Sequence, residues 1–557
     1  MVDRKEIINL LDAIADLMAF KGENPFKVNA FRNGANVIRK LDTPLEQLIK
    51  DKSLDNIKGI GKSLQSVIYE YAETGNSKVY EELKKEAPEG IKDLLKVRGL
   101  GSKKIKILYT ELGITNLGEL EYACKENRLA LLKGFGEATQ NKIIAELEKI
   151  RQYSKFILIS KAEEITDELL AKFSAFTSIQ DVAVSGEMRR GMEIISGILL
   201  IVQTGDKRKF IEEIKAIFPI TEDEDKIIIE SVFPISVSIY LSLNEDEFTK
   251  LLFITTGSED FLSNNQINKF ELKGKSEKEL FENIKLQFII PEMREAQYWE
   301  HENSNLMQNS DLSTENIKGL LHFHTTYSDA RNSLKEMLSA AGRMGFEYAV
   351  VCDHSKSAVY ANGLSEERIL IQKKEIMEIS SSLNLYVFQG IESDILEDGS
   401  LDYSNDILKS FDFIVASIHS RFNMEQDKMT ERLIRAIENP YTDLLGHPSG
   451  RLLLSRDPYK FDVKKVIDAC AQNKVAIEIN ANPHRLDLDW RWIYYAREKG
   501  CLFSINPDAH SIEDISYIKY GILTGRKGGL KHDEVINCFD IDNFKTFLSR
   551  KIIRNLL

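Results

Sequence analysis

The chain has 557 residues and a mass of 63.6 kDa, several times the usual domain size of about 100 to 200 residues, so three or more domains are expected. With 43% hydrophobic residues, 29% charged residues and only 11 Pro, the composition excludes long disordered segments. No run of about 18 apolar residues occurs, the N-terminal segment is interrupted by charges, and the five cysteines lack CxxC spacing. We therefore expect a cytoplasmic protein without a signal peptide, a membrane span or a disulfide framework.

The net charge of -13 by itself argues against a nucleic-acid partner, but charge acts locally. Residues 96–155 carry 12 Lys or Arg against 7 Glu and no Asp. This basic segment is where binding of phosphates is expected.

The first third of the chain reads as helices and glycine turns. Residues 5–20 and 26–41 show helical spacing of apolar residues, with a break at Asn24-Pro25. Gly-apolar-Gly then occurs three times, each time before a polar helix start, at Gly59-Ile60-Gly61, Gly99-Leu100-Gly101 and Gly134-Phe135-Gly136. The spacings of 40 and 35 residues indicate a repeated supersecondary unit.

Such turns suit phosphate binding, because glycine permits close backbone approach and the next helix offers unpaired N–H groups to an anion. The alternative is that each pair of glycines only forms a tight turn. Three copies beside a basic segment favour contacts with a DNA backbone, without sequence preference. The turns resemble helix-hairpin-helix elements, and the candidate DNA-binding residues are Gly59, Gly61, Lys62, Gly99, Gly101, Lys103, Gly134 and Gly136.

From Phe156 to about Leu243, alternating apolar residues predict a mixed sheet, with strands near 157–160, 179–188, 197–205, 227–233 and 235–243 and helices at 164–173 and 208–217. The motifs Gly186-Glu187-Met188-Arg189-Arg190-Gly191, Thr255-Thr256-Gly257-Ser258 and Ile290-Pro291-Glu292-Met293-Arg294 resemble landmarks of bacterial family X DNA polymerases. This resemblance implies a lyase-like helical DNA-binding domain at 1–95, a fingers-like helix-hairpin-helix domain at 96–155, a nucleotidyltransferase-like palm at 156–245 and a small thumb at 246–312.

The palm departs from that family where catalysis would occur. The family has Gly-Asp-x-Asp where this chain has Ser196-Gly197-Ile198-Leu199, and its third aspartate matches Ser238. Gly197, Leu199 and Ser238 are therefore degenerate polymerase positions without a carboxylate for magnesium. Glu187 stands where the family has a serine beside the incoming triphosphate. The lysine nucleophile of eukaryotic relatives matches Val67, which cannot form a Schiff base.

From Ile317 onward, buried strands alternate with helices. Seven strands end near residues 324, 354, 392, 419, 447, 482 and 510, which predicts a parallel (βα)7-type barrel with its chemistry at the C-terminal strand ends. Six of the nine histidines lie at these ends. His322 and His324, like Asp508 and His510, are spaced i, i+2, so that each pair faces one side and can bind a metal.

The barrel resembles the polymerase and histidinol phosphatase (PHP) domain, expected at 316–557. Its nine metal-ligand and catalytic positions match here as His322, His324, Asp329, His354, Glu392, His419, His447, Asp508 and His510. The resemblance implies one metal on His322, His324, Glu392 and Asp508, a second on Glu392, His419 and His447, and a third on Asp329, His354 and His510. Mixed imidazole and carboxylate ligands favour two to three divalent ions, most simply manganese or zinc. Arg421 and Arg451 are candidate phosphate clamps, with a surface ion pair as the alternative.

Taken together, these features predict a multidomain α+β and α/β protein: a DNA-repair phosphoesterase, of 3′ to 5′ exonuclease, abasic endonuclease or 3′-phosphatase type, on a family X scaffold. It would associate with the nucleoid when bound to DNA. The alternatives are an active gap-filling DNA polymerase, a phosphatase of small molecules like histidinol phosphatase, and a non-catalytic DNA scaffold. The missing carboxylates argue against a polymerase, and the DNA-binding architecture argues against a phosphatase of small molecules. The nine intact ligands argue against a non-catalytic scaffold.

Overall fold

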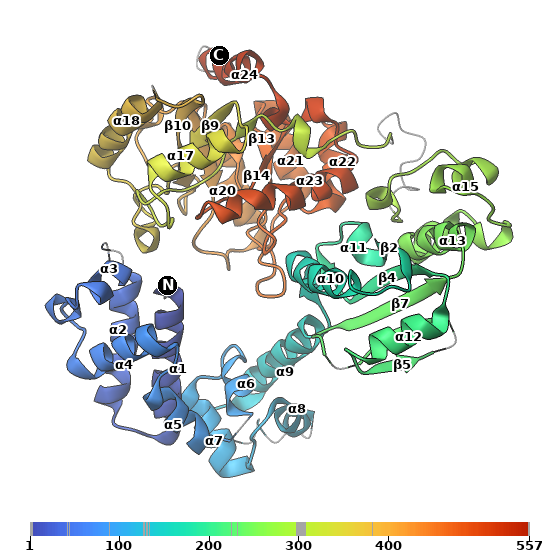
Figure 1. The fold of residues 1–557 in the computed structure, drawn as a ribbon. Helices are drawn as coiled ribbons and strands as arrows, with labels where there is room; N and C mark the ends of the chain where they lie inside the picture. The colour runs from blue at the N-terminus through green and yellow to red at the C-terminus, as the bar shows by residue number, and fades with distance from the viewer. Residues whose placement is uncertain are drawn as a thin grey trace. The chain divides into compact units, whose positions relative to one another are not determined.

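The computed structural model describes residues 4–41, 43, 45–88, 90–125, 129, 132, 134–223, 225–230, 232–296, 308–380 and 382–554. The chain forms two compact units, Met1–Ser154 and Lys155–Leu557, which are described separately. Figure 1 shows the first in blue to cyan and the second in green to red. None of the helices in the described part of the chain is long and apolar enough to cross a membrane.

The first unit is helical, as predicted. Its helices are α1 (Arg4–Lys21), α2 (Pro25–Arg39), α3 (Leu45–Lys50), α4 (Lys62–Thr74), α5 (Lys78–Glu86), α6 (Ile91–Leu95), α7 (Ser102–Leu112), α8 (Leu117–Lys125) and α9 (Gly136–Tyr153). The predicted break between the first two helices is confirmed, because the Asn24 side chain accepts a hydrogen bond from Phe26 N and Pro25 opens α2. Apolar faces of α1, α2 and α4 form one core, and those of α6 to α9 form another.

The three glycine turns precede α4, α7 and α9. In each, the central apolar residue is buried, at Ile60, Leu100 and Phe135, whereas the flanking glycines are exposed. The first glycine of each turn adopts positive φ, +101°, +86° and +92° at Gly59, Gly99 and Gly134. The apolar residue thus anchors each turn in the core, and its backbone is presented to solvent.

The green segment contains a five-stranded mixed sheet in the order β2-β4-β7-β6-β5. Its strands are β2 (Ile179–Ser185), β4 (Gly197–Thr204), β5 (Ile220–Glu222), β6 (Lys226–Ile229) and β7 (Ser236–Ser242), and a separate antiparallel pair joins β1 (Ile157–Leu158) to β3 (Ile194–Ile195). Helices α10 (Ile159–Phe173) and α12 (Lys207–Lys215) pack on the buried face of the sheet. The predicted strand over 157–160 is too long, because α10 begins at Ile159. The predicted strand over 179–188 is also too long, because Gly186 takes a φ of +64° and starts the short helix α11 (Gly186–Arg189).

Three short helices follow the sheet: α13 (Glu245–Thr256), α14 (Glu259–Asn264) and α15 (Glu277–Asn283). A buried ion-pair group joins them to α11. Arg189 binds both carboxylate oxygens of Glu277 at 3.0 and 2.6 Å, and Glu277 also accepts from the fully buried Arg294 at 2.6 Å.

The C-terminal segment forms seven parallel strands in consecutive order, which confirms the predicted barrel. They are β8 (Gly319–Leu320), β9 (Tyr348–Val351), β10 (Tyr386–Asp394), β11 (Phe413–Ser417), β12 (Leu444–Leu445), β13 (Ala476–Asn480) and β14 (Phe503–Asn506). The helices are α17 (Leu334–Arg343), α18 (Glu366–Ser380), α19 (Asn405–Leu408), α20 (Gln426–Glu438), α21 (Val463–Asn473), α22 (Trp490–Glu498), α23 (Ile518–Lys527) and α24 (Ile541–Arg554). A parallel bridge between Phe323 and Ala509 nearly closes the barrel by linking the segments after its first and last strands.

The sheet segment and the barrel are joined by buried polar contacts within the second unit. Glu193 accepts from Trp490 Nε1 at 3.1 Å and from Arg491 at 2.7 Å. The buried Lys527 Nζ lies 2.7 Å from Glu295 and 3.0 Å from the carbonyl of Arg190. These contacts hold the palm-like sheet directly against the barrel.

Candidate functional site

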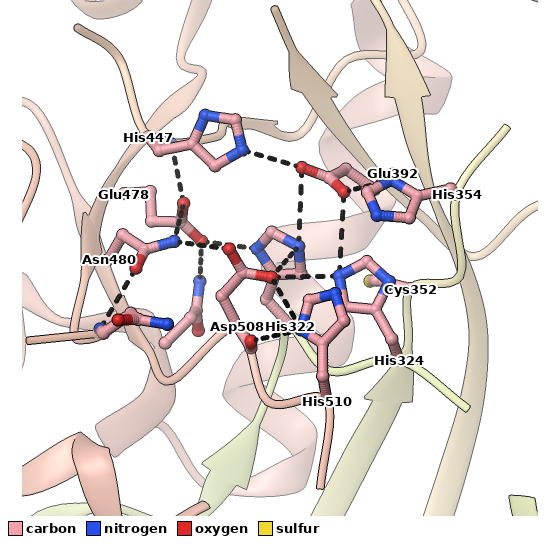
Figure 2. Close-up of polar contacts among 12 residues, drawn as sticks. His322, His324, Cys352, His354, Glu392, His447, Glu478, Asn480, Asp508 and His510 are labelled. Atoms are coloured by element: carbon pink, nitrogen blue, oxygen red, sulfur yellow. Dashed lines mark hydrogen bonds and ion pairs between the residues drawn. The ribbon is translucent and has the colours of Figure 1, made fainter. Parts of the chain in front are cut away.

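The barrel brings the nine predicted ligands together at the C-terminal ends of its strands. Three groups have ligand atoms within 4.8 Å of one another: His322, His324 and Asp508; His354, Glu392 and His419; and His324, Asp329, His354 and His510. Figure 2 shows most of these side chains converging on one point. Their arrangement follows from the topology, since parallel strands present their C-terminal ends on one side of a barrel.

His322 and His324 flank Phe323, and both are fully buried. His322 Nε2 lies 3.6 Å from a carboxylate oxygen of Glu392 and 3.6 Å from one of Asp508. His324 Nε2 lies 3.0 Å from Asp508 and 3.7 Å from Glu392. The i, i+2 spacing thus places both imidazoles against the same two carboxylates.

Glu392 is the centre of the arrangement. One of its oxygens lies 2.9 Å from His447 Nε2 and 3.3 Å from His419 Nε2, and the other lies 2.8 Å from His354 Nδ1. Burial alone would raise the pKa of Glu392, but the charges of His419, His354 and His322 hold it well below its ordinary value. Glu392 therefore stays ionised and can bridge two cations.

Asp329 and His510 are more accessible than the other ligands. Their side chains are 32% and 35% exposed, against 1% for those of Glu392 and His447. Asp329 lies 3.4 Å from His510 Nε2 and 3.6 Å from His354 Nε2. Among the nine side chains, this outer pair is the most open to solvent.

The histidines differ in charge according to their neighbours. Burial and the nearby charges of His510 and His354 lower the pKa of His324 to about 3. Burial opposes protonation of His419 as well, but the carboxylates of Glu392 and Asp394 outweigh it and raise its pKa to about 10. Asp329 similarly overcomes burial and raises the pKa of His510 to about 9.

These residues fit divalent metal ions. His322 Nε2, His324 Nδ1 and His447 Nδ1 are buried nitrogens without a hydrogen-bond partner. Two ligands that each lie about 2.0–2.2 Å from one ion are roughly 3–3.6 Å apart. The distances from His322 and His324 to their carboxylates, 3.0 to 3.7 Å, are close to that range. The donor set of imidazoles and carboxylates also suits such ions.

Three buried carboxylates that the sequence reasoning missed support the ligands. Asp394 lies 2.6 Å from His419 Nδ1, Glu478 lies 2.7 Å from His322 Nδ1, and Asp353 accepts from Thr325 and Ser328 in the loop after His324. The signal was present in the sequence: Asp394 follows Glu392 at i+2, and Glu478 is a charged residue inside an otherwise apolar buried strand.

The two candidate phosphate clamps have different surroundings. The Arg451 guanidinium is buried and engaged by Asp489 and by the carbonyls of Arg485 and Leu486, so it stabilises the loop. Arg421 is 67% exposed and lies 3.5 Å from Glu397. A third arginine, Arg485, was not singled out from the sequence, and its side chain is 17% exposed and lies 3.7 Å from Asp508.

The candidate DNA-binding residues lie on the three turns of the first unit. Lys62 and Lys103 are exposed at the first turns of α4 and α7. A Cβ atom at Gly61, Gly99, Gly101, Gly134 or Gly136 would meet nothing within 4 Å. The backbone at these turns is therefore open to a bulky ligand.

In the palm-like sheet, Leu199 of β4 pairs directly with Ser238 of β7, and Gly197 pairs with Ser236. The three degenerate positions therefore lie on adjacent strands, and none carries a carboxylate. The Glu187 carboxylate accepts hydrogen bonds from the backbone N–H of Ser196 at 2.6 Å and from its hydroxyl at 2.9 Å. The Glu187 carboxylate thus already occupies the two hydrogen-bond donors of Ser196, the residue before β4.

Comparison with known proteins supports the same organisation. The helix-hairpin-helix domain model matches residues 2–77, the SAM-like helix-hairpin-helix tandem model matches 91–149, and the PHP domain model matches 321–482. The DNA polymerase/3'-5' exonuclease PolX of Bacillus subtilis (strain 168) is 35% identical over 98% of this chain and 99% of its own length. The chain belongs to the bacterial family X DNA polymerases with a C-terminal PHP domain.

The barrel alone has further relatives. A probable phosphatase of Thermoanaerobacter sp. (strain X514) is 28% identical over 41% of this chain and 94% of its own length. A probable phosphatase of Caldanaerobacter subterraneus is 27% identical over 41% of this chain and 90% of its own length. Together with the family X relationship, these relatives make the chain a phosphoesterase of DNA metabolism.

Proposed function

We propose that this family X protein is a metal-dependent 3′ to 5′ exonuclease of DNA repair whose palm no longer polymerises. Abasic-site cleavage and 3′-phosphatase activity are further reactions that the same centre could perform. The observation that carries the proposal is the convergence of nine imidazole and carboxylate side chains, eight in clusters of ligand atoms and His447 beside Glu392. Three of them have buried nitrogens without a hydrogen-bond partner among the described residues.

We assign the ligands as the resemblance to PHP domains implies, with Glu392 shared between two of up to three ions, most simply manganese or zinc. When bound, such ions lower the pKa of a water molecule and neutralise charge on a phosphodiester. His322, His324 and Asp508 hold the innermost position, which is shielded from solvent. The exposed Asp329 and His510 face the incoming substrate.

The helix-hairpin-helix turns would hold the DNA through its backbone. Exposed glycine N–H groups and the lysines at the starts of α4 and α7 offer donors and positive charge without base-specific groups. An enzyme bound in this way would act on the chromosome in the cytoplasm. The basic segment 96–155 supplies the local charge that the acidic chain as a whole lacks.

The alternative of an active polymerase is favoured by the printed name of the Bacillus relative. Two features oppose it in this chain. The adjacent positions Leu199 and Ser238 lack carboxylates, and Glu187 places its charge on Ser196, where the family binds phosphates. Nearby acids do not replace the missing ones: Glu193 binds Trp490 and Arg491, and the hairpin before Lys226 lies beside Tyr240 rather than Ser238.

The relatives named probable phosphatases favour a second alternative, a phosphatase of small molecules. DNA degradation distinguishes the two. We would incubate the full chain and His322→Ala/His324→Ala with 3′-labelled and 5′-labelled duplexes and Mn²⁺. Loss of nucleotides from the 3′ end by the wild type alone is expected, whereas phosphatase activity on small esters with intact DNA would refute the nuclease.

A further inference from the structure

Strand β13 is the one barrel strand whose end carries none of the nine candidate ligands, yet Glu478 at its centre is a fully buried carboxylate. Its Oε1 lies 2.7 Å from His322 Nδ1 and accepts from Asn506 at 2.8 Å. Its Oε2 accepts from the backbone N–H of His447 at 2.6 Å and from Asn480 at 3.3 Å. Figure 2 shows Glu478 between the two histidines.

The first contact fixes the proton on His322. The same Oε1 also accepts from Asn506, so it acts as an acceptor toward His322, Nδ1 carries the hydrogen, and Nε2 is left as the nitrogen available to a metal. That nitrogen is the buried atom without a hydrogen-bond partner that lies between Glu392 and Asp508. With Nδ1 unprotonated, the imidazole would carry its hydrogen on the metal-facing side.

The second contact fixes the backbone of His447. Its φ of +25° is a conformation that residues with side chains rarely adopt, and the bond from its N–H to Glu478 stabilises it. In this conformation His447 Nε2 reaches Glu392 at 2.9 Å. Glu478 therefore holds one ligand from each of the two metal positions that share Glu392.

We propose that Glu478 is a positioning residue on which two of the metal ions depend together, through the tautomer of His322 and the backbone of His447. The inference rests on the proposed function, because it takes over its ligand assignment. The third position is built around Asp329, which lies beside His354 and His510, so we expect it to be retained without Glu478.

The test is the metal content and metal affinity of full-length Glu478→Gln. Glutamine keeps the size of the side chain but carries an NH2 donor. This donor either faces the N–H of His447 or donates to His322 Nδ1, which places the hydrogen of His322 on Nε2. We expect Mn²⁺ affinity at two positions to fall 10- to 100-fold, as typically follows the loss of a group that orients a ligand, while a third ion is retained. The Co²⁺-loaded variant should lose the corresponding absorption bands.

Asp443→Asn is the matched control. Asp443, just before β12, is also fully buried in the barrel, but its carboxylate accepts a hydrogen bond from the backbone N–H of Ile414. It should bind metal as the wild type does. Glu478→Asp keeps the charge but is too short to hold both histidines, so it should lose the same two ions even if Glu478→Gln does not fold. Wild-type affinity in either folded Glu478 variant would overturn the proposal. Unchanged metal content in His322→Ala/His324→Ala would instead overturn the proposed site itself.

Discussion

At the scale of single residues, the state of each imidazole in the barrel is set by the carboxylates around it. His419 and His510 lie against carboxylates that raise their pKa, whereas burial and the charges of two neighbouring histidines lower the pKa of His324 and keep it neutral. A metal ion needs neutral imidazoles, so its binding must displace protons from the first two. The centre therefore couples metal binding, pH and stability.

We expect the metal-free protein to lose stability as the pH rises from about 6.5, the ordinary pKa of histidine, to about 10. The pKa of His419 is raised to about 10 and that of His510 to about 9, so in this window the folded state binds more protons than the unfolded state. The stabilisation that the two protonated histidines give the folded state is complete below pH 6.5. It is lost once the pH exceeds their raised pKa values. Thermal unfolding in a chelator measures the effect, with His419→Gln as the comparison.

Excess Mn²⁺ should restore the melting temperature at pH 9, because metal replaces the lost protons. A wild-type melting temperature that rises with pH in chelator, relative to His419→Gln, would contradict this coupling.

The ligands themselves could be predicted from the sequence, because histidines at i, i+2 after apolar strands have few other uses. Glu478 is marked by its charge inside a buried strand, but its role could not be predicted, since that role depends on His322, which lies 156 positions away in the chain. The same limit explains Arg451: its partner Asp489 is 38 positions away, and only the folded loop brings them together.

At the scale of elements, each of the first two glycine turns combines two different requirements. Gly59 and Gly99 have positive φ and need glycine for their conformation, whereas Gly61 and Gly101 have ordinary φ and open space around them. Mutating the first glycine of a turn therefore tests its backbone conformation, whereas mutating the second tests the approach of DNA to the turn.

Gly99→Ala should destabilise the protein by about 1–2 kcal/mol, since a Cβ is disfavoured at this φ. Gly101→Ala should leave stability within about 0.5 kcal/mol but weaken DNA binding several-fold, because its methyl group lies where a phosphate would approach. Chemical denaturation and fluorescence anisotropy with a labelled duplex measure the two effects. Equal DNA affinity of Gly101→Ala and the wild type would argue against the turn as the contact.

The strand pairing of the palm-like sheet explains why we expect little or no DNA synthesis. The sequence predicts the main strands but not β5, which is only three residues long, and the pairing of Leu199 with Ser238 became visible only in the fold. That pairing places the degenerate positions where the family's metal ligands would be adjacent.

Templated nucleotide addition should therefore be absent or very weak, because this transfer depends on carboxylate-held metal ions. Glu392→Ala protein, in which degradation cannot mask synthesis, should fail to extend a gapped, primed template with four nucleotides. Restoring Asp at positions 197, 199 and 238 in that background, with Glu187→Ser, should yield detectable extension. Robust extension before the restoration would show that the palm alignment is wrong.

At the scale of the whole molecule, an acidic chain with a net charge of -13 concentrates positive charge in residues 96–155. We therefore expect the salt dependence of DNA affinity to arise from lysines and arginines of the first unit rather than from the net charge of the chain. Lys62→Gln/Lys103→Gln should weaken binding and reduce the slope of log affinity against log salt by about 1–2, since each phosphate contact contributes about 0.9.

Lys161→Gln/Lys172→Gln is the control, because these exposed lysines pair with neighbouring glutamates of α10 in the second unit. An unchanged salt slope in Lys62→Gln/Lys103→Gln, or an equal change in the control, would place the DNA contacts elsewhere.

The central claim is that a family X scaffold here serves the barrel's hydrolytic centre rather than synthesis. The most direct measurement uses one gapped duplex with a 5′-labelled primer, Mn²⁺ and all four nucleotides, and follows primer length with the wild-type protein. We predict a ladder of shorter primers that disappears with His322→Ala/His324→Ala. Primers that grow longer would show that the protein serves synthesis. Primers that the double variant shortens as fast as the wild type would show that the barrel's histidines are not the hydrolytic centre.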